Sequence, residues 1–258
     1  MESSLHRELK RIYAGESART EVRLGRYIID ALVGDELVEI QHGNLSAIRD
    51  KIRTLCETHV VRIVKPLIAR KYLVKPSPKN PLKSSRRVSP KKQTFLDIFE
   101  QLVRFTRAFP HPNLTLELSL VEIEDHRVPG HGRRRRYRAT DHVTLDQRLL
   151  AVNESCLIRT LEDLRSLLGP RVARLPLEFT TADLSETLGI QRWQAQQIAY
   201  VFRECGGLLE LGKRGGGRLY AWKPVEVAAP TVVAKTAPRK RKPRNAAVAP
   251  KPAKRKAG

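Results

Sequence analysis

The sequence lacks long apolar runs and has few cysteines, and both absences narrow the class of protein. No segment reaches the roughly 18 consecutive apolar residues that a membrane-spanning helix needs, and the opening MESSLHRELK lacks the apolar stretch of a signal peptide. The three cysteines are odd in number and far apart in the chain, so they predict neither a disulfide framework nor a zinc site. We therefore expect a cytoplasmic protein that does not interact with membranes.

Acidic residues are scarce compared with basic ones. The 258 residues include 27 Asp and Glu against 49 Lys and Arg, which gives a formal net charge of +22. Residues 223–258 hold eleven basic residues and one acidic residue, in an Ala- and Pro-rich segment that predicts a disordered tail. This balance indicates a polyanionic partner, and we expect double-stranded DNA and association with the nucleoid.

The beginning of the chain predicts a helix, a three-stranded meander, a second helix and a further strand. Apolar residues at helical spacing place the helices at 4–14 and 44–58, and Asn44 is a suitable N-cap for the second. Residues 20–41 alternate in the manner of strands. The apolar run 60–64 predicts a short buried strand, which the intervening helix should bring parallel to the last strand of the meander.

Two tight turns, at Gly25-Arg26 and Gly34-Asp35, set the expected register of the meander. In that register Glu21 lies opposite Asp30, and Asp30 lies opposite Glu39. The other face is wholly apolar and is expected to be core; it comprises Val22, Leu24, Tyr27, Ile29, Ala31, Val33, Val38 and Ile40. Because opposed like charges are destabilising, three aligned carboxylates predict a bound cation, Mg²⁺ or Mn²⁺. The alternative is a solvated acidic face without a metal.

The middle of the chain predicts less regular structure. Four prolines and many basic residues at 75–93 favour a linker or mobile loop. Beyond it, the pattern predicts a helix at 94–109, a strand at 113–124 and a short helix at 160–169. The run RRRRYR predicts phosphate contacts, with a solvated loop as the alternative; its candidates are Arg133, Arg134, Arg135 and Arg136.

Residues 178–222 predict two helices around a turn at Gly189, followed by two strands around a Gly-rich basic loop. This order resembles a winged helix-turn-helix domain. The resemblance implies that the second helix reads base edges, with Trp193, Ile198 and Val201 on its packed side, while the loop contacts phosphates. The candidate nucleic-acid-binding residues are Gln191, Arg192, Gln194, Gln196, Gln197, Lys213, Arg214 and Arg218. A protein-interaction module is the alternative.

The element order of residues 1–74, with YIID ending at Asp30 and EIQ at 39–41, resembles the PD-(D/E)XK nuclease superfamily. The resemblance implies that Asp30, Glu39 and the carbonyl of Ile40 bind Mg²⁺, which activates water for phosphodiester hydrolysis. It also implies that Glu21 is an additional acid, a role for which Glu8 is the rival candidate.

The sequence departs from that family's motif at two positions. Ile29 stands where the family has proline, and Gln41 stands where it has the catalytic lysine. Gln41 cannot carry a positive charge, and Lys51 or Arg49 on the following helix could supply it instead.

These observations predict an α/β (α+β) protein with a PD-(D/E)XK-like mixed sheet, flanking helices, a winged-helix domain and a basic tail. The expected segments are 1–75 (nuclease-like), 76–93 (linker), 94–177 (α+β middle region), 178–222 (winged helix) and 223–258 (tail). The predicted function is a Mg²⁺-dependent nuclease that acts on DNA. The alternative is a non-catalytic DNA-binding regulator or nucleoid-associated protein with a degenerate nuclease fold.

Overall fold

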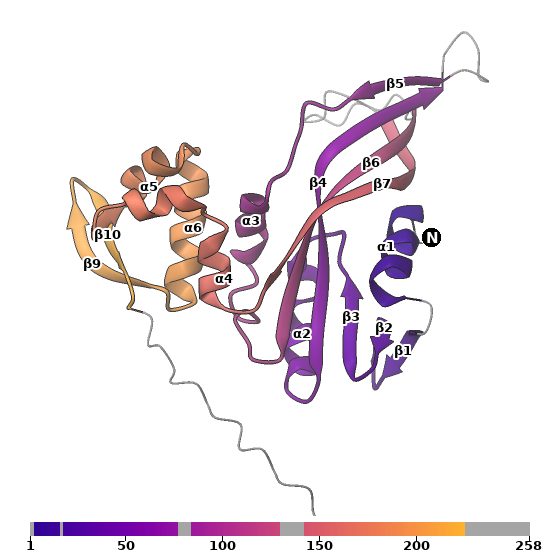
Figure 1. Cartoon of the computed structure of the whole chain (residues 1–258), viewed down its shortest axis with the longest axis horizontal. Helices are drawn as coiled ribbons and strands as arrows, with labels where there is room; N and C mark the ends of the chain where they lie inside the picture. Colours follow the sequence, from indigo (N-terminus) through magenta and orange to yellow (C-terminus); the bar gives the residue numbers. More distant parts are fainter. Residues whose placement is uncertain (1–2, 16–17, 77–83, 130–141, 225–258) are drawn as a thin grey trace, which may run out of the picture. The chain divides into compact units, whose positions relative to one another are not determined.

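A computed structural model of the chain describes residues 3–15, 18–76, 84–129 and 142–224 (Figure 1). The predicted phosphate-binding run Arg133–Arg136 and nearly all of the predicted tail lie outside these residues. In the described part of the chain, no helix combines the length and the apolarity that crossing a bilayer requires.

A seven-stranded mixed sheet with helices on both faces contains most of the first 158 residues. Its strand order is β1-β2-β3-β4-β6-β7, and β5 pairs with β4. The strands are β1 (Arg19–Leu24), β2 (Tyr27–Val33), β3 (Glu36–Ile40), β4 (Val60–Pro76), β5 (Ser84–Val88), β6 (Leu114–Pro129) and β7 (His142–Ile158). The helical elements are α1 (Ser4–Ala14), η1 (Leu45–Ala47), α2 (Arg49–Cys56), η2 (Phe95–Asp97) and α3 (Ile98–Leu102).

The element order predicted for the beginning of the chain is confirmed. Glycines 25 and 34 adopt φ values of +56° and +59°, which permit the tight turns of the meander. Asn44 accepts a hydrogen bond from the Ser46 backbone N–H, although the turn that it caps is 3-10 and α2 begins at Arg49. Strand β4 is parallel to β3, as the intervening helix predicts.

Apolar cores lie on both faces of the sheet at β2, β3 and β4, so the prediction of one apolar face and one acidic face is wrong. Helix α2 covers one face, where Ile52 packs in the same core as Leu37. Helix α1 covers the other face, where Leu5 packs in the same core as Val38. A sheet that contains parallel strands is normally covered on both faces, because its crossover connections place helices there.

Strand β2 changes face at Asp30. Ile29 and Ala31 would share a face in a regular strand, yet Ile29 packs in the α2-side core and Ala31 in the α1-side core. The β2–β3 ladder ends at the Ala31–Val38 pair, and the side chain of Asp30 accepts a hydrogen bond from the Ile40 backbone N–H at 2.8 Å. The directly opposed Glu21 has a φ of +53°. These irregularities divide the predicted apolar face between two cores.

The middle of the chain is more regular than predicted. The strand predicted at 60–64 extends to Pro76, and residues 84–88 of the predicted linker form β5, which pairs with it. The predicted helix at 94–109 is reduced to the short elements η2 and α3. The sheet therefore continues past residue 75 through β6 and β7, since pairing between distant segments outweighs local composition.

The C-terminal part adds four helical elements and a three-stranded sheet of order β8-β10-β9. Its elements are α4 (Leu161–Ser166), η3 (Pro170–Arg174), β8 (Glu178–Thr180), α5 (Thr181–Leu188), α6 (Arg192–Glu204), β9 (Leu208–Arg214) and β10 (Gly217–Trp222). Thr160 caps α4, as predicted, and Gly189 ends α5 in the left-handed conformation.

This C-terminal part shares its core with the larger sheet. The Phe202 ring of α6 lies 5.6 Å from the Phe99 ring of α3, centroid to centroid. Ile198 and Val201 are buried as predicted, but Trp193 is 49% exposed, so its predicted place on the packed side is wrong. By its contacts the chain up to Lys223 is one compact unit.

Candidate functional site

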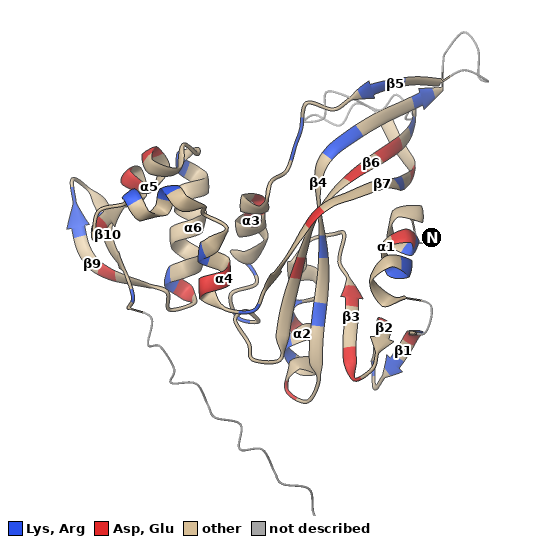
Figure 2. Ribbon diagram, viewed as in Figure 1, with Lys and Arg blue, Asp and Glu red and all other residues tan. Residues whose placement is uncertain are grey.

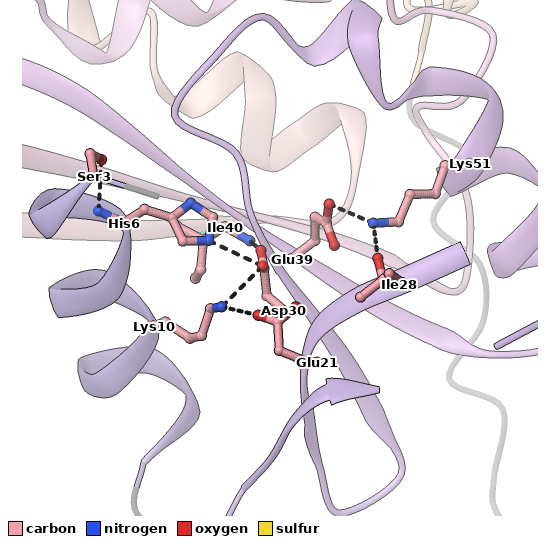
Figure 3. A network of polar contacts seen from close by, with 9 residues as sticks. All are labelled: Ser3, His6, Lys10, Glu21, Ile28, Asp30, Glu39, Ile40 and Lys51. Carbon is pink, nitrogen blue, oxygen red and sulfur yellow. Dashed lines mark hydrogen bonds and ion pairs between the residues drawn. The ribbon is translucent and has the colours of Figure 1, made fainter. Parts of the chain in front are cut away.

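Asp30 lies where β2 leaves β3, and α1 supplies two of its side-chain partners, His6 and Lys10 (Figure 3). His6 Nε2 lies 3.1 Å and Lys10 Nζ 3.5 Å from Oδ1 of Asp30. Lys10 also forms an ion pair with Glu21. Burial raises the pKa of Asp30, but hydrogen bonds from His6 and from the Ile40 N–H, with the charge of Lys10, lower it below its ordinary value overall. Asp30 is therefore ionised at neutral pH.

Glu39 turns toward the other helix. Lys51 Nζ of α2 lies 2.7 Å from Oε1 of Glu39 and 2.6 Å from the Ile28 carbonyl oxygen. Only 10% of the Glu39 side chain is exposed. Burial raises the pKa of Glu39, while Lys51 opposes the rise and the nearby Asp30 charge adds to it. The last effect places the Asp30 and Glu39 carboxylates within electrostatic range of each other.

The three acids are thus matched by cations rather than left to repel one another. Glu21 and Asp30 share Lys10, and Glu39 has Lys51. Over the residues that the structure describes, no three Asp, Glu, His or Cys side chains gather closely enough to hold a metal ion. The predicted three-acid cluster is therefore not formed: Glu21 stays with Asp30, whereas Glu39 points to α2 (Figure 3).

One buried carboxylate oxygen at this site, Oε2 of Glu39, lacks a hydrogen-bond partner among the described residues. An unpaired buried carboxylate oxygen is costly, and such an atom is often a ligand or a catalytic group. Carboxylate oxygens are the hard donors that Mg²⁺ and Mn²⁺ prefer, and Glu39 Oε2 and the ionised Asp30 are donors of this kind.

Of the two candidates for the missing positive charge, the structure brings only Lys51 to Glu39. Arg49 instead pairs with Asp50 at 3.1 Å. Gln41, at the motif-lysine position, donates its side-chain N–H to the Asn44 carbonyl oxygen at 2.8 Å and so fixes the chain after β3. The carboxylate of Glu8 accepts a hydrogen bond from the Leu149 backbone N–H at 2.7 Å. This hydrogen bond links α1 to β7.

A buried lysine supports the same loop. Lys65 of β4 is 2% exposed, and its Nζ donates to the carbonyl oxygens of His42 and Gly43 at 2.9 and 2.5 Å. Burial lowers the pKa of Lys65 to about 8 and that of His42 to about 4, the latter with the charges of Lys65, Lys71 and His6. Sequence patterns did not reveal Lys65, because a lysine within an apolar run carries no signal of its partners.

A second candidate site is a cleft of about 550 Å³ between α6 and the β9–β10 hairpin. It brings together the predicted Arg192, Gln196 and Arg218. Arg203, another polar position of the predicted recognition helix, and Tyr200 complete the α6 side of the cleft, and Tyr200 could not be assigned to the interface from its residue type alone. Its spacing of four residues from Gln196 was the available signal, since such residues share a helix face.

The other predicted residues of this region have different surroundings. Gln191 and Gln194 form the capping box of α6, and Gln197 is half-buried. Arg214 pairs with Asp183, and Arg218 pairs with Glu210 at 3.0 Å. Lys213 is exposed and makes no ion pair with a described residue. Among the cations of the hairpin, Lys213 is therefore the one whose charge is least neutralised.

Comparison with known proteins gives a family and a relative. A family model described as "Domain of unknown function (DUF8091)" matches residues 3–159, which span the seven-stranded sheet and stop before the helix-and-hairpin part. A protein of Treponema pallidum (strain Nichols), titled "Uncharacterized protein", is 28% identical over 225 residues, which cover 86% of each chain. No solved structure matches the chain.

Proposed function

The chain belongs to the DUF8091 family, and we propose that it is a divalent-metal-dependent nuclease that acts on double-stranded DNA. The observation that carries the proposal is the carboxylate of Glu39. It is buried, one oxygen is held by Lys51 and the other has no partner among the described residues, and it lies close to an ionised Asp30. This is the arrangement expected of a cation ligand next to a fixed positive charge.

The topology around these residues supports the same proposal. An α1-β1-β2-β3-α2-β4 order, with an antiparallel meander and β4 parallel to β3, is the arrangement for which residues 1–74 resemble PD-(D/E)XK nucleases. In that comparison Asp30 and Glu39 are the metal ligands and the Ile40 carbonyl oxygen is a further ligand. Lys51 takes the place of the motif lysine that Gln41 cannot supply.

Each residue then has a role that its surroundings permit. Asp30 and Glu39 would hold Mg²⁺ or Mn²⁺, and the bound ion would supply activation of a water and neutralisation of the phosphate charge. Lys51 orients Glu39 through the 2.7 Å contact and offers a positive charge to the phosphate. His6 and Lys10 keep Asp30 ionised and in position. The cleft beside α6 binds DNA away from the cleaved bond.

The test is cleavage of supercoiled plasmid with Mn²⁺ or Mg²⁺ at pH 8. The parent should convert the plasmid to open-circular or linear form, whereas Asp30→Asn and Glu39→Gln should slow this conversion at least a hundredfold. Asp35→Asn is the matched control, because Asp35 is an exposed acid in the turn of the same meander. Its rate should equal that of the parent. A parent without metal-dependent cleavage, or equal rates in all four proteins, would contradict the proposal.

A second function has its own observation in its favour. Each of the three acids already pairs with a cation from α1 or α2, so the sheet does not need a metal to offset their charge. A non-catalytic DNA-binding protein, with DNA bound at the α6 cleft, is consistent with that pairing. Tight DNA binding by a parent protein that shows no metal-dependent cleavage would favour this function.

A further inference from the structure

Residues 70–76 of β4 and residues 84–93 together form a projecting basic ribbon (Figures 1 and 2). They contain seven cations and no acid: Arg70, Lys71, Lys75, Arg86, Arg87, Lys91 and Lys92. Figure 2 shows Lys and Arg positions along β5 and the adjoining end of β4, and acidic positions on the neighbouring β6.

The second half of the ribbon is fixed to β4 along its length. Val88 pairs with Tyr72, and the Ser89 backbone N–H donates to the Lys71 carbonyl oxygen at 2.8 Å. Further along, Gln93 exchanges two hydrogen bonds with the backbone of Ile68, at 2.9 and 2.7 Å. The cations of residues 84–93 are therefore presented on an ordered backbone, and little entropy is lost when they bind a partner.

The seven cations divide into two groups. Three are matched by acids of β6: Arg86 lies 2.8 Å from Glu124, and Lys71 and Arg70 lie 3.7 and 4.0 Å from Asp125 and Glu122. The other four, Lys75, Arg87, Lys91 and Lys92, make no ion pair with a described residue, and all but the half-buried Lys75 are exposed. The acids of β6 therefore neutralise cations near both ends of the ribbon, and Arg87, Lys91 and Lys92 remain exposed and available to a partner.

The spacing between the ribbon and Glu39 matches the dimensions of a nucleic-acid duplex. Glu39 pairs with Ile63 of β4, and Arg87 pairs with Leu73, ten residues further along the same strand. At roughly 3.3 Å per residue, ten residues span at most roughly 33 Å, because β4 is irregular between Ile68 and Arg70. One turn of B-form DNA is roughly 34–36 Å.

We propose that the basic ribbon binds the phosphate backbone of double-stranded DNA, with Arg87 about one helical turn from the phosphate to be cleaved at Asp30 and Glu39, and Lys91 and Lys92 closer to it. This inference rests on the proposed DNA substrate but not on catalysis. Arg87, Lys91 and Lys92 neutralise backbone phosphates and so fix the register of the duplex, and they carry no base specificity. Lys71, at the base of the ribbon, is within electrostatic range of His42, which follows β3.

The test is the salt dependence of binding to a duplex of about 20 base pairs, roughly two turns. Fluorescence anisotropy is measured on the full chain in EDTA, so that cleavage plays no part. The ribbon variant carries Arg87→Gln and Lys91→Gln. The control carries Arg104→Gln and Arg107→Gln, which remove the same charge from two exposed arginines near α3.

Each lost phosphate contact should lower the slope of log K against log salt by roughly 0.9. The ribbon variant should therefore lose roughly 1 to 2 from the slope, while the control keeps the slope of the parent. A ribbon variant with the parent slope, or a control that loses as much, would overturn the proposal. An unchanged melting temperature in both variants confirms that folding is intact. Failure of the nuclease proposal appears instead as absent cleavage, which this binding measurement does not involve.

Discussion

At the residue scale, burial of Lys65 changes its pKa and therefore the pH dependence of stability. It is 2% exposed, and its Nζ has two carbonyl partners but no carboxylate partner among the described residues, so burial lowers its pKa from 10.5 to about 8. The folded state then binds this proton less tightly than the unfolded state does. Between pH 8 and 10.5 the unfolded chain holds more protons at this residue, so stability must rise with pH across that window.

We predict that Lys65→Met removes this rise. A pKa difference of one unit corresponds to about 1.4 kcal/mol, so the parent should gain up to about 3 kcal/mol over the variant between pH 8 and 10.5. Urea unfolding gives the free energy of unfolding of the parent and of Lys65→Met at pH 8 and at pH 10.5. The contributions of other titrating groups are the same in both proteins and cancel when the two are compared. Parallel pH profiles would show that Lys65 stays charged in the folded protein.

For Asp30, sequence and structure predict opposite effects of the same substitution on stability. Sequence register predicts that Asp30 is repelled by Glu21 and Glu39, which would make Asp30→Asn stabilising. The structure gives it His6, Lys10 and the Ile40 N–H, so the same substitution should destabilise the metal-free protein. His6 and Lys10 could not be predicted, because the rotation of α1 against the sheet decides which side chains reach Asp30.

At the scale of elements, turns and helix caps could be predicted because they depend on residues close together in the sequence. Strand lengths could not, because they depend on distant segments. The meander and its turns follow from Gly25 and Gly34, and the N-caps follow from Asn44 and Thr160. The lengths of β4, β6 and β7 and the existence of β5 depend on pairing between distant segments, which local patterns do not specify. Lys51 was a candidate only because α2 follows β3 directly.

Helix α6 carries a prediction that separates base contacts from phosphate contacts. Arg192 and Gln196 line the cleft beside the hairpin, whereas Lys213 is exposed on the hairpin itself. Arg192→Ala and Gln196→Ala should reduce any sequence preference, at about 1–3 kcal/mol for a bidentate contact, while Lys213→Ala should weaken binding to all duplexes alike. Affinities for several duplexes of different sequence test this. If all three variants bind every duplex as the parent does, α6 and its hairpin do not contact DNA.

At the scale of the whole molecule, the two sheets share one core. Phe202 of α6 packs against Phe99 of α3 at 5.6 Å and against Trp222 of β10 at 5.0 Å. The larger sheet and the C-terminal helices should therefore unfold together, although the sequence predicts separate segments at 94–177 and 178–222.

Phe202→Ala is the variant that tests this coupling. Truncating a buried Phe costs about 3–5 kcal/mol, and the cost should lower one shared transition rather than split it in two. Near-UV circular dichroism, which reports aromatic packing, and hydrogen exchange in β4 and β6 should both follow the same transition. Loss of the C-terminal helices while β4 and β6 remain protected would mean that the two parts fold independently.

The central claim is that Glu39 and Asp30 bind a divalent cation, and Mn²⁺-dependent thermal stabilisation tests it most directly. At a hundredfold excess over Kd, a ligand stabilises the folded state by about 2.7 kcal/mol. For a protein of this size the melting temperature should then rise by roughly 5–10 °C. Measurement at pH 8 keeps Glu39 ionised, because burial raises its pKa and protonation at lower pH would weaken binding.

The parent and the Asp35→Asn control should show this rise in equal measure, and Glu39→Gln and Asp30→Asn should not show it. The variants are compared as shifts between metal-free and metal-loaded protein, so that their own effects on stability cancel. A parent whose melting temperature does not respond to Mn²⁺, or a shift of equal size in Glu39→Gln, would contradict the metal site at these carboxylates.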